Sequence, residues 1–92
     1  MLTEVHEPVD VGVVFHMRPC RSAASLQKDQ VRPVWFLWRG RKYPVVRTTY
    51  RWKERRGEAW FHFFSVFDGT HTFELIYDAK SLCWQLGRVS LE

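Results

Sequence analysis

Residues 59–78 have the sequence AWFHFFSVFDGTHTFELIYD, and this stretch carries the strongest structural signal in the chain. Its first nine residues are dense in aromatic side chains, which is typical of a β-strand packed on both faces. Asp68-Gly69 follows, a dipeptide that favours a hairpin turn. Apolar and polar residues then alternate over residues 71–77, which predicts a strand with one buried face. The stretch therefore predicts a β-hairpin.

The same two-residue period recurs on both sides of this hairpin. We expect strands at residues 9–16, 33–38, 42–53, 59–67, 71–77 and 82–89. Gly40-Arg41 is placed for a tight turn, and Pro44 indicates an edge strand or a bulge. Strands spaced about ten residues apart with short turns are typical of antiparallel meanders. The sequence thus predicts an all-β fold, a single antiparallel meander of about six strands curled into a small barrel or sandwich.

The expected domain is a single β unit over residues 4–90. Residues 17–30 break the alternation, and we interpret them as a long loop or insert. The final Leu-Glu, residues 91–92, resembles residues left by a cloning site and is excluded from functional reasoning.

Composition excludes several classes of protein. Of the 92 residues, 46% are hydrophobic and 16% aromatic, which excludes a disordered chain. No apolar run approaches the roughly 18 residues of a membrane span, and the first residues lack the pattern of a secretion signal. Two cysteines are too few for a disulfide scaffold, so we expect a cytoplasmic protein in which Cys83 is a small buried side chain.

Charge is segregated along the chain, although the net charge is only +4. Residues 1–10 and residues 57–92 each carry −3, whereas residues 11–56 carry +10. A middle segment this basic favours a polyanionic partner. The alternative is that these basic side chains pair with the acidic segments once the chain is folded.

The basic residues of the middle segment form the candidate nucleic-acid site. Alternation along residues 42–53 places Arg47, Thr49, Arg51 and Lys53 on one face, about 7 Å apart, a spacing that suits contacts to phosphates. Aromatic neighbours would stack on bases. The candidate binding residues are Arg39, Arg41, Lys42, Arg47, Arg51, Lys53, Trp35 and Tyr43. The alternative is a solvated strand face whose charge discourages edge pairing.

Catalysis and metal binding have no signature in the sequence. Glu74 and Asp78 share a strand face, but exposed carboxylates on a strand are ordinary surface residues. The four histidines and two cysteines lack metal-ligand spacing, and no Gly-rich phosphate loop or nucleophile elbow is present. We expect no enzymatic activity, no cofactor and no bound metal.

Most of the chain also resembles a known family. The residues that carry the resemblance are EPVDV at 7–11, RPVWFLWRGRKYPV at 32–45, Trp52, FELIYD at 73–78 and WQL at 84–86. They are similar to a small bacterial domain of unknown function, which occurs alone and at the C-terminal end of Y-family polymerase-like proteins. The resemblance implies a compact β domain that acts in DNA repair or mutagenesis and has no catalytic residues. The longer connection at residues 17–30 departs from the family's pattern.

These observations lead to two functional hypotheses. The first is a non-enzymatic module that binds nucleic acid weakly through its basic hairpin and long strand. The second is a protein-interaction module that docks a larger repair or polymerase-like protein.

Overall fold

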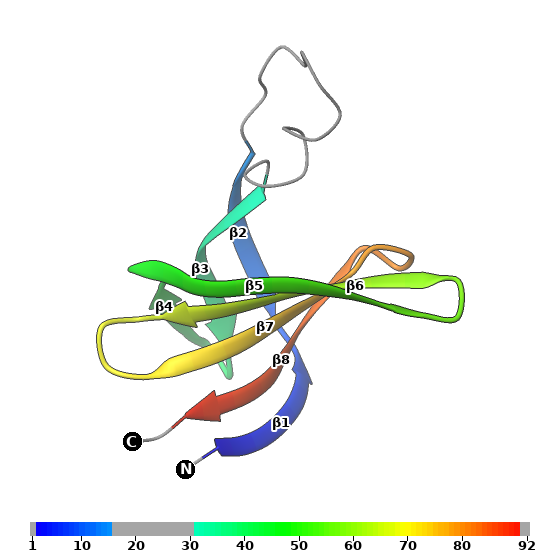
Figure 1. Cartoon of the computed structure of the whole chain (residues 1–92). Helices are drawn as coiled ribbons and strands as arrows, with labels where there is room; N and C mark the ends of the chain where they lie inside the picture. The colour runs from blue at the N-terminus through cyan, green and yellow to red at the C-terminus, as the bar shows by residue number, and fades with distance from the viewer. Residues whose placement is uncertain (1, 16–30, 91–92) are drawn as a thin grey trace.

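Eight strands form two antiparallel sheets in the computed structural model, which describes residues 2–15 and 31–90 (Figure 1). Sheet A contains, in spatial order, β1 (Leu2–Pro8), β8 (Cys83–Ser90), β7 (Thr72–Asp78), β6 (Ala59–Phe67) and β5 (Arg47–Arg56). Sheet B contains β2 (Asp10–Phe15), β3 (Val31–Trp38) and β4 (Arg41–Pro44). The strands of sheet B run steeply across those of sheet A in Figure 1. The predicted loop at 17–30 and residues 91–92 lie outside the described residues.

The all-β class and the antiparallel pairing are confirmed, but the strands number eight rather than about six. Residues 2–8 form an additional strand, because they pair with β8 from the other end of the chain. The stretch predicted as one strand at 42–53 divides into β4 and β5, which belong to different sheets. The two sheets are not closed into a barrel. Among the described residues, no helix is long and apolar enough to cross a membrane.

The chain passes between the two sheets at two points with its backbone hydrogen-bonded. At the first, the Val9 amide donates to the Trp84 carbonyl at 3.2 Å. At the second, the Val45 amide donates to Val34 of sheet B at 2.9 Å, and the next amide, Val46, donates to Phe67 of sheet A at 2.8 Å. Pro44 ends β4, which is an edge strand of sheet B, as the sequence predicted for this proline.

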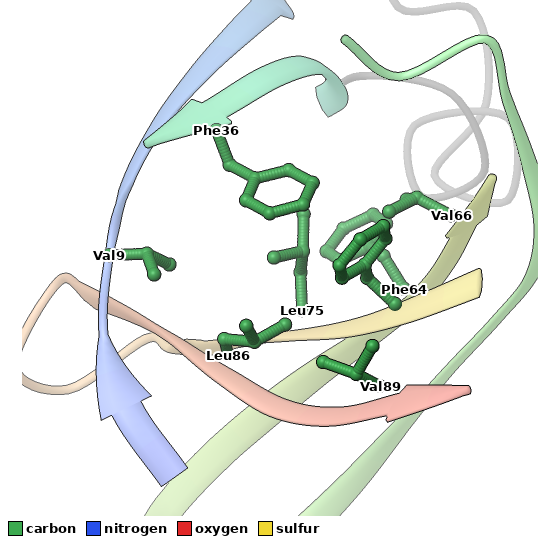
Figure 2. Packing of buried hydrophobic residues seen from close by; sticks show 8 residues of the cluster. Val9, Phe36, Phe64, Val66, Leu75, Leu86 and Val89 are labelled. Atoms are coloured by element: carbon green, nitrogen blue, oxygen red, sulfur yellow. The ribbon is translucent and has the colours of Figure 1, made fainter. Parts of the chain in front are cut away.

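The core lies between the sheets and is centred on Phe36 of β3, whose side chain is completely buried. Its ring stacks on Tyr43 of sheet B and meets Phe73 of sheet A edge-on, with both centroid distances 5.0 Å. Figure 2 shows Phe36 pointing from sheet B toward Leu75 and Phe64 of sheet A. Because one aromatic ring contacts both sheets, it holds them at their packing distance.

Two local features differ from the sequence-based expectations. The β3–β4 turn is made by Arg39 and Gly40, one residue earlier than predicted, and both have positive φ (53° and 76°), as a two-residue type I′ turn requires. Cys83, expected to be buried, is exposed at the start of β8.

Replacing Phe36 with alanine is expected to lower the free energy of unfolding by about 3–5 kcal/mol, because it leaves a cavity between the sheets. Urea denaturation followed by tryptophan fluorescence measures this loss. The control is Leu2→Ala, because Leu2 is 62% exposed at a strand end and its loss should change stability by less than about 0.5 kcal/mol. Equal effects of the two substitutions would contradict the central role of Phe36.

Candidate nucleic-acid interface

A β-bulge at Thr49 divides β5 into two parts whose side chains alternate in opposite phase. Thr48 lies opposite Val66 of β6 and Tyr50 lies opposite Ser65, so Thr49 is an extra residue without a partner. Its hydroxyl donates to the carbonyl of Ser65 at 3.1 Å, which fixes the bulge. Such an insertion reverses the faces of all later residues relative to strict alternation.

The bulge places Arg47 and Arg51 on opposite faces of sheet A. Arg47 is opposite Phe67, whereas Arg51 is opposite Phe64, and positions 64 and 67 of the regularly paired strand β6 point to different faces. Phe64 belongs to the core, so Arg51 is on the inner face, which sheet B partly covers. The prediction that Arg47, Arg51 and Lys53 share one face is therefore wrong for Arg47.

The inner face beyond the core combines basic and aromatic side chains, and we call it the basic-aromatic face. Lys53, His62, Tyr77 and Trp84 lie opposite one another across β5, β6, β7 and β8. Arg55 lies opposite Trp60 in the adjacent row. The members of this face are Arg51, Lys53, Arg55, Trp60, His62, Tyr77 and Trp84.

Cations and rings are in contact on this face. The Lys53 ammonium lies 4.9 Å from the centroid of the Trp60 ring, and the Arg55 guanidinium carbon lies 6.0 Å from it. Trp60 is nevertheless 41% exposed. At the other end of the row, Trp84 packs 4.9 Å from Tyr77 and 5.4 Å from Phe64 of the core. Trp60 is therefore the accessible ring, and Trp84 anchors the row to the core.

The surroundings of His62 lower its pKa. Burial lowers the pKa of His62 below its ordinary value of 6.5, and the positive charges of Lys53 and Arg51 lower it further. The neutral form of this imidazole, which lies 6.2 Å from Tyr77, is therefore favoured over the charged form.

Arg39, in the turn that follows β3, forms an ion pair with an acidic residue. Its guanidinium donates to both carboxylate oxygens of Glu7 on β1, at 2.7 and 3.2 Å, and the Trp38 indole donates to the same carboxylate at 3.0 Å. The hydrogen bond from Arg39 is the largest cause of the lowered pKa of Glu7. For Arg39, the hypothesis that segregated charges pair in the folded chain is confirmed.

The remaining candidates lie apart from the basic-aromatic face. Arg41 lies over Tyr43, at 5.3 Å, and Tyr43 packs against the core rather than offering a ring for stacking. Lys42 and Trp35 lie together on the outer face of sheet B, with the ammonium 4.8 Å from the indole. The indole lies so close across Gly12 that a Cβ atom there would come within 2.1 Å of it.

Of the eight candidate residues, the structure thus brings only Arg51 and Lys53 together on this face. Sequence reasoning missed Arg55, Trp60, His62, Tyr77 and Trp84 as members. Part of this arrangement could have been predicted from the sequence. A two-residue turn at Gly57-Glu58 places Lys53 opposite His62 and Arg55 opposite Trp60.

The carboxylates considered as a catalytic pair have structural partners. Glu74 forms an ion pair with Arg88 of the neighbouring strand, with an N–O distance of 3.8 Å. Asp78 accepts hydrogen bonds from the amides of Lys80 and Ser81, and the Lys80 bond is the largest cause of its lowered pKa. Within residues 2–15 and 31–90, no three histidine, cysteine or acidic residues are grouped to hold a metal ion.

Comparison with protein-family models, curated proteins and solved structures found no match to this chain.

An NMR titration of His62 tests the electrostatics of the basic-aromatic face. Its pKa is expected below 6.5, and Lys53→Met should raise it because a neighbouring positive charge is removed. The matched control is Arg47→Met, on the outer face of the same strand, which should leave the pKa unchanged.

The same shift predicts how stability depends on pH. Because the folded chain binds the His62 proton more weakly than the unfolded chain does, this contribution to stability is present above about pH 6.5. It is lost as the pH falls through the lower folded value. A His62 pKa at or above 6.5 in the folded protein would contradict the arrangement.

Proposed function

We propose that this chain is a non-enzymatic module that binds single-stranded nucleic acid, weakly and with little sequence preference, on the basic-aromatic face. The observation that carries the proposal is the exposed Trp60 ring between the alternate cations of β5. Single-strand-binding surfaces combine basic groups that follow the backbone with aromatic rings on which bases stack.

The basic side chains have a spacing suited to a nucleic-acid backbone. Arg51, Lys53 and Arg55 occupy alternate positions of one strand, about 7 Å apart. Lys53 and Arg55 form no ion pair with any described carboxylate, so their charges are available to phosphates. Three such contacts to a single strand give a slope of log K against log salt of about −2.

The aromatic side chains favour a single strand over a duplex. The exposed ring of Trp60 offers stacking to an unpaired base, whereas the bases of a duplex are already stacked on one another. Readout by stacking and phosphate contacts is tolerant of sequence, which supports weak and general binding. The resemblance to the domain of Y-family polymerase-like proteins suggests a setting in DNA repair or mutagenesis.

Fluorescence anisotropy with a labelled oligothymidylate at two salt concentrations tests the proposal. The double variant Lys53→Glu/Arg55→Glu should lose at least tenfold in affinity, because it places negative charge beside the phosphates. The matched control is Arg47→Glu/Arg56→Glu, which changes the net charge equally on the outer face of the same strand and should weaken binding much less. Equal losses in the two double variants would reject the site.

Trp60→Ala separates stacking from charge, because it removes the ring and keeps every cation. Base stacking contributes about 1–3 kcal/mol per base, so affinity should fall about fivefold or more. Thermal unfolding of the variant checks that the fold is retained. If the unaltered protein binds no oligonucleotide at low salt, the proposal fails and docking to a larger repair protein becomes the better hypothesis.

A further inference from the structure

A groove of about 750 Å³ lies between the first half of β3 and the first half of β5, where the two sheets diverge. Residues 32–34 form one wall and residues 47–51 form the other, and the sheet crossing at Val45 and Val46 also lines it. Arg51 is the only residue lining the groove that also belongs to the basic-aromatic face, among those that the structure describes.

Both walls of the groove are strand edges. β4 pairs with β3 only from Trp35 to Trp38, so it does not extend along residues 31–34. β5 is the last strand of sheet A, and its outer edge pairs with no other strand of the described chain. At the mouth of the groove, the Arg51 guanidinium donates to the Val31 carbonyl and so bridges the two walls. Unpaired strand edges are templates for an added strand.

The groove lining indicates the chemistry of an occupant. It includes Arg32, Arg47 and Arg51 and no acidic residue among those described. Val46 is 61% exposed and Tyr50 is 65% exposed, which leaves apolar surface at the rim. The Thr48 hydroxyl is buried and has no hydrogen-bond partner, although buried polar groups are nearly always paired. Carboxylates, backbone amides and apolar side chains together would satisfy this lining.

We propose that the groove binds an extended acidic segment of a partner protein, which adds to the outer edge of β5 as a further strand. Main-chain hydrogen bonds to residues 47–51 supply the affinity, and the positive charge of the arginines selects a ligand that carries carboxylates. This inference does not depend on the proposed nucleic-acid function, because the two binding surfaces use opposite halves of β5 and share only Arg51.

The test uses the ¹⁵N-labelled full chain and a synthetic heptapeptide in which glutamate and valine alternate. Binding should shift the amide signals of residues 31–34 and 47–51 and slow hydrogen exchange along the β5 edge. A matched peptide with N-methylated valines cannot donate those main-chain hydrogen bonds and should bind at least tenfold more weakly. A peptide with lysine in place of glutamate should not bind.

Two variants and one control separate this site from the nucleic-acid site. Arg32→Glu should weaken peptide binding at least fivefold and leave oligothymidylate affinity within twofold. Arg56→Glu, on the outer face, should leave peptide binding unchanged. Lys53→Glu/Arg55→Glu should weaken oligothymidylate binding at least tenfold and leave peptide binding unchanged.

Three outcomes would overturn this inference, and none of them bears on the nucleic-acid proposal. The first is absence of peptide binding. The second is binding without slower exchange along β5, which would show charge attraction rather than strand addition. The third is protection of the same amides by a second copy of the chain, seen as concentration-dependent dimerisation in sedimentation.

Discussion

The fold depends on the chain passing between the sheets without leaving its backbone unpaired. At the second crossing, consecutive amides are held by different sheets: Val45 by Val34 in sheet B and Val46 by Phe67 in sheet A. These two consecutive hydrogen bonds mark where sheet B ends and sheet A begins. The crossing turns β5 across β3, and Phe36 fills the space between the sheets. It also leaves the edges of β3 and β5 apart, and that gap is the groove.

The bulge at Thr49 has the next largest consequence, because it distributes the basic residues of β5 over two faces. Without an extra residue, strict alternation would place Arg47, Arg51, Lys53 and Arg55 in one row. With it, Arg47 lies over Phe67 on the outer face, at 4.7 Å, and the other three remain on the inner face with Trp60 and His62. The extra residue, whose hydroxyl donates a hydrogen bond to Ser65, therefore places Arg47 on one face of sheet A and Arg51, Lys53 and Arg55 on the other.

Features that depend on residues adjacent in the sequence could be predicted, whereas features that depend on pairing with another strand could not. The hairpin of β6 and β7 follows from alternation and a turn dipeptide, so it was predictable. The bulge at Thr49 was not, because threonine is an ordinary strand residue and the extra position is defined only by the partner strand. The division between β4 and β5 depends on the hydrogen bonds of Val45 to Val34 and of Val46 to Phe67, two residues that belong to different sheets. Strand β1 likewise exists through pairing with β8.

Folding pairs only some of the basic side chains with acidic ones, and the positions of the basic side chains left without an acidic partner bear on the proposed function. Glu7 from the acidic N-terminal segment pairs with Arg39, and Glu74 pairs with Arg88. Neither pair involves a residue of β5. Lys53 and Arg55 instead face rings, which attract cations through the π-electron quadrupole but leave their charge uncompensated. Exposed charges without acidic partners attract polyanions over the distance of a Debye length, and this supports our proposal that the second half of β5 contacts phosphates. The first half, with arginines beside an open strand edge, is suited to carboxylates on a chain that can also form main-chain hydrogen bonds.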